Sequence, residues 1–211
     1  MQKLAIIGSG DLGQQIAYHA RADKKYEVVG FFDDFKENYE KVNGISILGK
    51  ISDIINLYNQ GRLDCIIIGI GYKHMPFRKN LFERFHGIVP FGTYIHSSCL
   101  IDKSSIVGKG SVIFPGCLID QKVVIEENVL LNVGCCVAHD SIVGAHSFLS
   151  PRVAIAGFTK VGKQCILGIN STIIDNLELV DLVQLGAASV AIKNIDKPGL
   201  YVGNPIRFIR E

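Results

Sequence analysis

The sequence has little charge imbalance and no long apolar run, and both absences narrow the class of protein. Charged residues make up 20% of the 211 residues, and the formal net charge is only +2. This balance, together with the lack of any block of Lys and Arg, excludes a dedicated nucleic-acid-binding surface. No apolar stretch reaches the roughly 18 residues that a membrane-spanning helix needs.

The first residues also lack the pattern of an export signal. The opening segment MQKLAIIGSG carries one lysine and a run of only four apolar residues before a glycine turn, which is too short for a secretory signal. The six cysteines are therefore expected to be reduced thiols in a cytoplasmic protein. Because the C-x-x-C spacing of zinc sites is absent, we expect no metal.

What the sequence does contain is a repeat of six residues. Every sixth position from Ile95 to Ala191 is Ile, Leu, Val or Ala, which makes 17 positions without a gap. Small or β-branched residues dominate two positions earlier. Such a period predicts a parallel β-helix, whose stacked coils bury one continuous apolar column. Cys99, Cys117 and Cys135 are 18 residues apart, so we expect them to stack as small inward-facing residues.

The first 92 residues follow a different pattern. The segments KLAII, YEVVGFF, ISILG and LDCIIIG read as strands, while DLGQQIAYHA and MPFRKNLFERFHG read as helices. Pro76 marks the start of the second helix and Gly87 its end. Alternating strands and helices predict a small parallel α/β sheet. We therefore expect two domains, an α/β domain at 1–92 and a β-helix at 93–211.

A glycine motif follows the first predicted strand. Gly8, Gly10 and Gly13 have the spacing of a phosphate-binding turn, and Asp33 follows Gly13 by 20 residues, where an acid can bind ribose. The domain nevertheless has room for only half of a dinucleotide-binding fold, and no hydride-transfer machinery can be identified. A mononucleotide with an appended group therefore fits better. The alternative is that the glycines serve only the tight turn from strand to helix.

Seven segments together resemble one family over essentially the whole chain. They are IIGSGDLG, FFDD, IGYKHMPFR, GTYIHSSCLI, VAHDSIVG, IAGFTKVG and LYVGNPIRFIR. The family is the bacterial nucleotide-amino-sugar N-acetyltransferases with their sialic-acid O-acetyltransferase relatives. The resemblance implies a Rossmann-like domain that holds a nucleotide-linked sugar. It also implies a left-handed β-helix of 18-residue coils, which as a homotrimer binds acetyl-CoA between subunits.

The resemblance also assigns roles to individual residues. It implies that His139 is the general base, that Asp140 orients its imidazole, and that the Gly157 N–H contacts the acetyl group. An imidazole titrates in the right range to take a proton from an attacking amine. Gly157 follows His139 by 18 residues, which is one coil. The nucleotide sugar is expected to contact Gly8, Ser9, Gly10, Gly13, Asp33, Asp34 and Gly71.

Other polar residues are weaker candidates. Lys36 and Arg78 are open to two interpretations, as partners of a diphosphate or as solvated surface charges. The family has a second histidine near position 148, but His146 is two residues away, so no role is transferred to it. A zinc site formed by His96, His139 and His146 is disfavoured, because the three lie in different phases of the repeat.

The function expected from these observations is acetyl-CoA-dependent N-acetylation of a nucleotide-linked 4-amino-4,6-dideoxy sugar, carried by UDP or dTDP. Acetyl-CoA is the co-substrate. The alternatives are a sugar O-acetyltransferase of the sialic-acid type, an NAD-dependent oxidoreductase, and a nucleotide-sensing or assembly protein without turnover.

Overall fold

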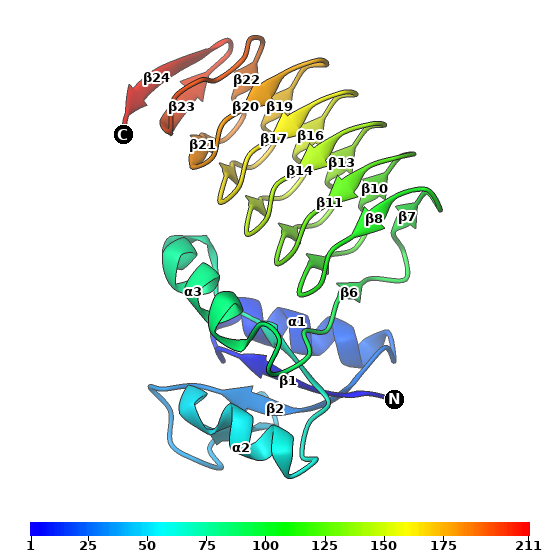
Figure 1. Cartoon of the computed structure of the whole chain (residues 1–211), viewed down its shortest axis with the longest axis vertical. Coiled ribbons are helices and arrows are strands. Elements are labelled where there is room, and N and C mark those ends of the chain that lie inside the picture. Colours follow the sequence, from blue (N-terminus) through cyan, green and yellow to red (C-terminus); the bar gives the residue numbers. More distant parts are fainter. The chain divides into compact units, whose positions relative to one another are not determined.

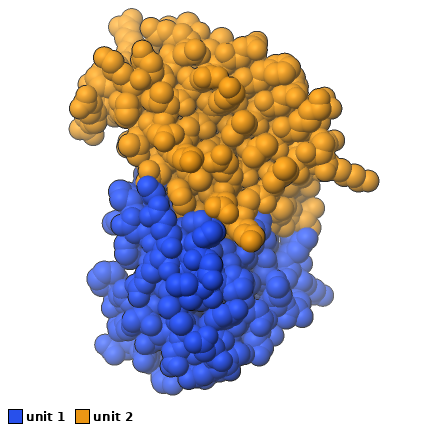
Figure 2. Space-filling view, viewed as in Figure 1, with its two compact units in different colours: residues 1–94 blue, residues 95–211 orange.

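The structure, a computed structural model, describes residues 1–211. The chain forms two compact units, Met1–Tyr94 and Ile95–Glu211, which have different colours in Figure 2. Unit 1 is an α/β domain and unit 2 is a parallel β-helix of the left-handed type, which confirms the predicted fold class. No helix combines the length and the apolar character that crossing a membrane requires.

Unit 1 is built on one five-stranded sheet. Its strands run in the order β3-β4-β2-β1-β5, and all neighbours are parallel except β3 and β4. The strands are β1 (Lys3–Ile7), β2 (Glu27–Phe32), β3 (Lys41–Val42), β4 (Ile45–Gly49) and β5 (Cys65–Ile68). Strand β1, which lies between β2 and β5, is buried from Leu4 to Ile7, as expected for a parallel sheet covered on both faces.

Helices follow three strands of this sheet, namely β1, β4 and β5 (Figure 1). They are α1 (Asp11–Ala22), α2 (Ile54–Asn59) and α3 (Met75–Phe85), with single 3₁₀ turns η1 (Ile51–Asp53) and η2 (Tyr72–His74). Helices α1 and α3 and strands β1, β2, β4 and β5 confirm the sequence predictions. The sequence did not predict α2 or β3, because elements of six and two residues are too short to show a clear hydrophobic period.

Unit 2 is a three-sided stack of short strands (Figure 1). Each strand pairs in parallel with the strand 18 residues later; for example, Leu118 lies opposite Cys136. The first side holds β6 (Tyr94–Ile95), β9 (Val112–Ile113), β12 (Leu130–Leu131), β15 (Phe148–Leu149), β18 (Ile166–Leu167) and β21 (Val183–Leu185). The second side holds β7 (Leu100–Ile101), β10 (Leu118–Ile119), β13 (Cys136–Val137), β16 (Ala154–Ile155), β19 (Thr172–Ile173) and β22 (Val190–Ala191). The third side holds β8 (Ile106–Val107), β11 (Val124–Ile125), β14 (Ile142–Val143), β17 (Lys160–Val161) and β20 (Glu178–Leu179).

The six-residue repeat forms the core of this stack. Its members from Ile113 to Ala191 are at most 3% exposed, and the first three members, in the opening coil, pack against them while partly buried. The predicted cysteine stack is also confirmed, because Cys117 and Cys135 are fully buried and Cys99 is partly buried. The apolar column therefore holds the coils in register, and each corner residue lies directly above the corner residue 18 positions earlier.

Hydroxyl groups at the inner corners join one coil to the next. The Ser147 Oγ donates to the Gly162 carbonyl at 3.0 Å and accepts from the Cys165 N–H at 3.1 Å. The Ser141 Oγ makes the same pair of bonds, to the Ala156 carbonyl at 3.0 Å and from the Thr159 N–H at 3.2 Å. These bonds explain why small polar residues stand two positions before the apolar repeat: they satisfy buried backbone groups where the chain turns.

The β-helix ends in a hairpin that the sequence did not predict as a pair of strands. Strand β23 (Gly199–Gly203) continues the first side in parallel with β21. Strand β24 (Ile206–Arg210) then returns antiparallel to β23. The hairpin covers the edge that the last coil would otherwise present for strand pairing.

Candidate active site

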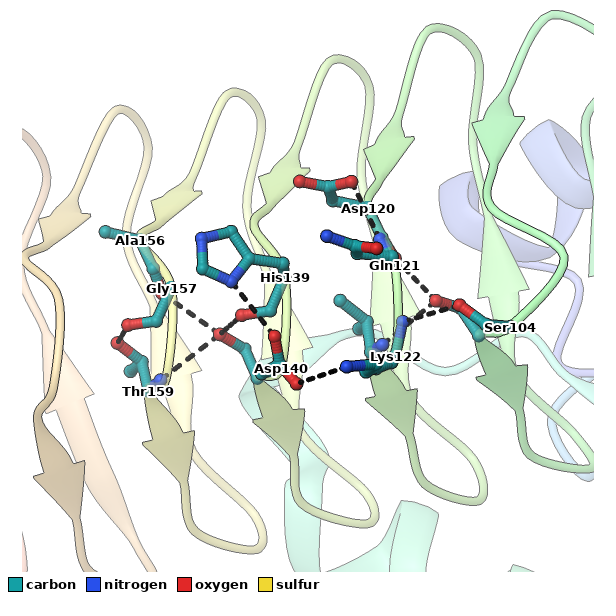
Figure 3. Close-up of polar contacts among 12 residues, drawn as sticks. Ser104, Asp120, Gln121, Lys122, His139, Asp140, Ala156, Gly157 and Thr159 are labelled. Carbon is teal, nitrogen blue, oxygen red and sulfur yellow. Dashed lines mark hydrogen bonds and ion pairs between the residues drawn. The ribbon is translucent and has the colours of Figure 1, made fainter.

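His139 and Asp140 lie at the corner between β13 on the second side and β14 on the third (Figure 3). The corner turns through a left-handed residue, and Asp140 has φ +56° there, a conformation that Asp and Asn adopt more readily than most residues. The Asp140 N–H donates to the Gln121 carbonyl at 3.0 Å. The sequence therefore fixes the pair on a rigid, hydrogen-bonded corner of the stack.

The two side chains contact each other directly. The His139 Nδ1 lies 3.1 Å from the Asp140 Oδ2, and the two side chains are 39% and 29% exposed. With Nδ1 paired to a carboxylate, a neutral imidazole carries its proton on Nδ1 and leaves the Nε2 lone pair open to accept another. The arrangement suits a general base that is oriented by an acid.

Gly157 lies one coil beyond His139 and packs closely against the imidazole ring. A Cβ added at Gly157 would lie 2.8 Å from both Cε1 and Nε2 of His139, so no other residue fits without moving the imidazole. The Gly157 carbonyl accepts from the Asn176 N–H at 3.0 Å, whereas the Gly157 N–H donates none of the hydrogen bonds in the structure. The Gly157 N–H and the His139 Nε2 therefore lie on neighbouring coils, and neither has a hydrogen-bond partner in the structure.

The corner has different character on the two sides of His139. The coil before it presents Asp120, Gln121 and Lys122, and the coil after it presents Ala156 and Gly157 (Figure 3). Phe158 follows Gly157, and its ring meets the His139 ring edge to face, with centroids 5.0 Å apart and an interplanar angle of 87°. The histidine thus separates a polar surface from an apolar one.

Two neighbours of the pair were missed by the sequence analysis. The Lys122 Nζ lies 3.8 Å from the Asp140 Oδ1, and the Phe158 ring contacts His139. Both residues are 18 positions from Asp140, one before it and one after. Applying the coil length to Asp140 as well as to His139 would have identified them.

In unit 1, the glycine loop is fastened by Asp33. The Asp33 Oδ2 accepts from the Ser9 N–H at 2.9 Å and from the Ser9 hydroxyl at 2.6 Å, and its Oδ1 accepts from the Phe35 N–H at 3.0 Å. Burial by itself raises the pKa of Asp33, but the hydrogen bonds from Ser9 and Phe35 outweigh it and hold that pKa below its usual 3.8. Asp33 is therefore an anion that shapes the loop.

The four glycines predicted to contact the nucleotide sugar differ in their backbone conformation and packing. Gly8 has φ +94°, the left-handed region that favours glycine. Gly13 packs so closely that a Cβ there would lie 2.0 Å from the Gly8 carbonyl oxygen, so it brings α1 against the loop. A Cβ added at Gly10 or Gly71 would meet only open space, and these two glycines precede α1 and η2. Only Gly8 of these four lines the nearby cavity.

A cavity of about 310 Å³ opens at this end of the sheet. Gly8, Asp33 and Asp34 contribute to its lining, and the Asp34 Oδ1 also accepts from the Ile51 N–H at 2.8 Å. Most of its lining comes from residues that no sequence motif indicated, which are Phe32, Phe35, Ile51, Ile70, His74 and Phe77. Phe35 is 96% exposed and Phe77 is 45% exposed, so two aromatic rings stand at an apolar cavity beside the glycine loop.

The weaker candidates are placed away from these groups or have other partners. The Lys36 Nζ pairs with the Glu40 carboxylate at 2.7 Å. Arg78 is fully buried and donates to the Ile68 and Ile70 carbonyls, so its interpretation as a solvated surface charge is wrong. The desolvation of its guanidinium lowers its pKa to about 10.

The histidines outside the pair lie at other corners. His146 is 9% exposed and its Nδ1 lies 3.0 Å from the Asn128 Nδ2. His96 follows β6, His139 follows β13 and His146 follows β14, so the three occupy different corners of the coil. No group of three or more His, Cys, Asp or Glu side chains is arranged to hold a metal ion.

Comparison with known proteins agrees with both units. The family model of the PglD N-terminal domain matches residues 3–85. Two solved structures match at 25% identity over the whole chain. The acetyltransferase domain of PglB from Neisseria gonorrhoeae, in complex with acetyl coenzyme A, has a TM-score of 0.90 and covers 99% of each chain. PerB from Caulobacter crescentus, in complex with CoA and GDP-perosamine, has a TM-score of 0.89 and covers 99% of this chain and 98% of its own.

A third structure extends the likeness at the level of the fold. WeeI from Acinetobacter baumannii is 17% identical with a TM-score of 0.67, over 99% of this chain and 100% of its own. Residues 3–85 thus match the PglD N-terminal domain, and the chain as a whole has the fold of the sugar acetyltransferases that it matches.

Proposed function

We propose that the protein is an acetyl-CoA-dependent N-acetyltransferase whose acceptor is the amine of a nucleotide-linked 4-amino-4,6-dideoxy sugar. The observation that carries this proposal is that the His139 Nε2 and the Gly157 N–H, one coil apart, both lack a hydrogen-bond partner. One group accepts a proton and the other donates to an oxyanion, which are the two requirements of acyl transfer. The two relatives crystallised with acetyl coenzyme A or CoA support the choice of acyl donor.

The reaction follows from these two groups. The neutral amine attacks the thioester carbonyl, so that an N–C bond forms and the carbonyl oxygen gains negative charge, which the Gly157 N–H stabilises. The His139 Nε2 accepts the proton that the nitrogen loses. The C–S bond then breaks, and the thiolate leaves as free CoA after taking up a proton. Asp140 keeps Nδ1 protonated and stabilises the imidazolium while it lasts.

We propose that the cavity of unit 1 holds the nucleotide. Flat nucleobases stack on aromatic side chains, and Phe35 and Phe77 offer exposed rings at its rim. The loop at Gly8 and Ser9 precedes the N-terminus of α1, where backbone N–H groups favour phosphate. UDP and dTDP are the nucleotides that we favour. PerB was crystallised with a GDP sugar, so GDP belongs in every test.

Calorimetric titration with UDP, dTDP and GDP tests this nucleotide site. Wild type should prefer one nucleotide, and Phe35→Ala should weaken its binding by about 10-fold, because stacking on one ring contributes roughly 1–3 kcal/mol. Tyr39→Ala is the control, since Tyr39 is an exposed aromatic residue outside the cavity lining. Equal binding of the preferred nucleotide by wild type and Phe35→Ala would contradict the proposed location.

We further propose a homotrimer assembled through the β-helix. Large apolar side chains point outward from the first coils, where Leu100 is 70% exposed, Ile106 62% and Leu118 46%. Exposed apolar surface of this kind marks an interaction site. The second side of the β-helix, which carries Leu100 and Leu118, ends at the corner that holds His139. Light scattering should give three times the chain mass, and Leu118→Glu should yield monomers. A monomeric wild type would contradict the trimer.

The acceptor screen tests the whole proposal. Purified protein is offered acetyl-CoA with UDP-, dTDP- and GDP-linked 4-amino-4,6-dideoxy sugars, and both free thiol and acetylated product are measured. Turnover with one nucleotide and formation of an amide are expected. An ester product on a sugar hydroxyl would instead identify a sugar O-acetyltransferase, and no product from any acceptor would contradict the proposal.

A further inference from the structure

Phe158 is an unexpected residue for its position. It has φ +56°, and left-handed backbone is disfavoured for bulky residues. The left-handed residues in register with it at this corner are Lys122, Asp140 and Asn176, and all three are polar. Phe158 is the aromatic residue among them, and its side chain remains 55% exposed. Its burial within the fold therefore does not explain why phenylalanine stands there.

The surroundings of Phe158 are those of the proposed reaction. It directly follows Gly157, whose N–H has no hydrogen-bond partner, and its ring contacts the His139 imidazole. A thioester carbonyl held at the Gly157 N–H has its carbon roughly 3 to 4 Å from that nitrogen, given ordinary hydrogen-bond length. The first atoms of the acyl chain then fall within reach of the Phe158 ring.

The polarity of the corner at His139 indicates which part of the substrates contacts the Phe158 ring. Sugar hydroxyls and the amine suit the polar coil before His139, with Asp120, Gln121 and Lys122 (Figure 3). Ala156, Gly157 and Phe158 on the coil after it form an apolar surface, and the apolar group nearest the reacting carbonyl is the acyl chain. An exposed ring that loses water when an apolar group covers it favours that contact.

From this placement we propose that Phe158 is the specificity residue of the acyl donor, with its ring forming the wall that limits the acyl group to two carbons. This inference rests on the proposed function and adds to it the selection of acyl length. An acetyl methyl group packs against the ring. A longer chain meets the ring and displaces either the thioester from the Gly157 N–H or the His139 imidazole from its position.

The test is an acyl-length series with three variants. Acetyl-, propionyl- and butyryl-CoA are compared with one nucleotide amino sugar, using wild type, Phe158→Ala, Phe158→Leu and Asn176→Ala. Asn176 is the matched control, because it has φ +60° at the same corner one coil further on. Wild type and Asn176→Ala should lose at least about 10-fold in kcat/KM from acetyl to butyryl, since a wall that rejects added methylene groups has effects of this size.

In Phe158→Ala the ratio of butyryl to acetyl kcat/KM should rise by about 10-fold or more, with Phe158→Leu in between. An unchanged ratio would overturn the inference, whether the overall rate stays the same or falls. A uniform fall would show that the ring only positions His139 or contacts another part of CoA.

Binding without acceptor separates this inference from the proposed function. The Kd values of acetyl-, propionyl- and butyryl-CoA are measured by calorimetry for wild type and Phe158→Ala. A length dependence present in wild type and lost in Phe158→Ala supports the wall even if no tested sugar is acetylated. An identical length dependence in both proteins overturns the wall even if the acetyltransferase reaction is observed.

Discussion

The Gly157 Cα stands against the His139 ring so closely that a methyl group there would lie 2.8 Å from both Cε1 and Nε2. Gly157 does not have the positive φ that would itself disfavour a side chain. Replacing Gly157 therefore leaves the backbone acceptable and moves the imidazole. The two residues act as one unit, in which the glycine makes room for the base and offers its own N–H to the carbonyl.

Gly157→Ala is predicted to lower kcat by about 10²-fold, because misplacing a catalytic group by an ångström costs this much. Melting temperature and KM for the nucleotide sugar should change little. The double variant with His139→Ala is the control, since a change that acts through the imidazole has no further effect once the imidazole is gone. Additive losses in the double variant would contradict this explanation.

Asp140 and Lys122 should contribute very differently to turnover. Asp140→Asn removes the charge that faces Nδ1 and allows the wrong tautomer, so kcat should fall by about 10- to 100-fold. Lys122→Ala should cost less than about fivefold, because an exposed ion pair of 3.8 Å contributes at most roughly 1 kcal/mol. Steady-state kinetics of the two variants check this order, and a Lys122→Ala defect as large as that of Asp140→Asn would contradict it.

Ser141 and Ser147 provide a matched pair for separating stability from activity. Each hydroxyl joins a carbonyl and an N–H of the next coil. Replacing either by Ala should lower the free energy of unfolding by about 1–3 kcal/mol, because buried backbone groups lose their partners. Only Ser141→Ala should also reduce kcat, since Ser141 follows the His139 corner. Equal kinetic effects of both substitutions would contradict the local role of Ser141.

Asp33 should make the stability of unit 1 depend on pH in acid. Its pKa in the folded state is below the usual 3.8. Its contribution is therefore fully present above about pH 4 and is lost as the pH falls through the lower folded value. All α-helices lie in unit 1, so the helical circular dichroism signal in a denaturant titration reports this unit. Asp33→Asn should have a lower free energy of unfolding than wild type at pH 7, and this difference should become smaller at pH 3. A difference that does not change with pH would contradict the lowered pKa of Asp33.

The β-helix could be predicted from the sequence in detail because its repeat is strictly local. Each six-residue step from Ile95 to Ala191 predicts one inward-facing position, and these side chains form the buried apolar column of the β-helix. The coil length also placed Gly157 beside His139. These relationships depend only on counting residues, so no tertiary information is needed.

The cavity of unit 1 and the two neighbours of Asp140 were harder to find. Phe35, Ile51 and Phe77 come from three separate connections, and only the folded sheet brings them to one cavity. Phe158 carries no motif of its own, and its contact with His139 depends on side-chain direction as well as register. Arg78 was left open to two interpretations because nothing in its local pattern showed that its guanidinium binds the carbonyls of Ile68 and Ile70, at the end of β5 and just beyond it.

The most direct test of the central claim is release of free CoA thiol from acetyl-CoA by wild type, His139→Ala and His86→Ala, with the preferred nucleotide amino sugar as acceptor. His86 is an exposed histidine at the end of α3 and serves as the control. We predict that His139→Ala lowers turnover by about 10²- to 10⁴-fold, that the affinities for acetyl-CoA and nucleotide are preserved, and that His86→Ala equals wild type. Turnover of His139→Ala close to that of wild type would contradict a general base at this corner.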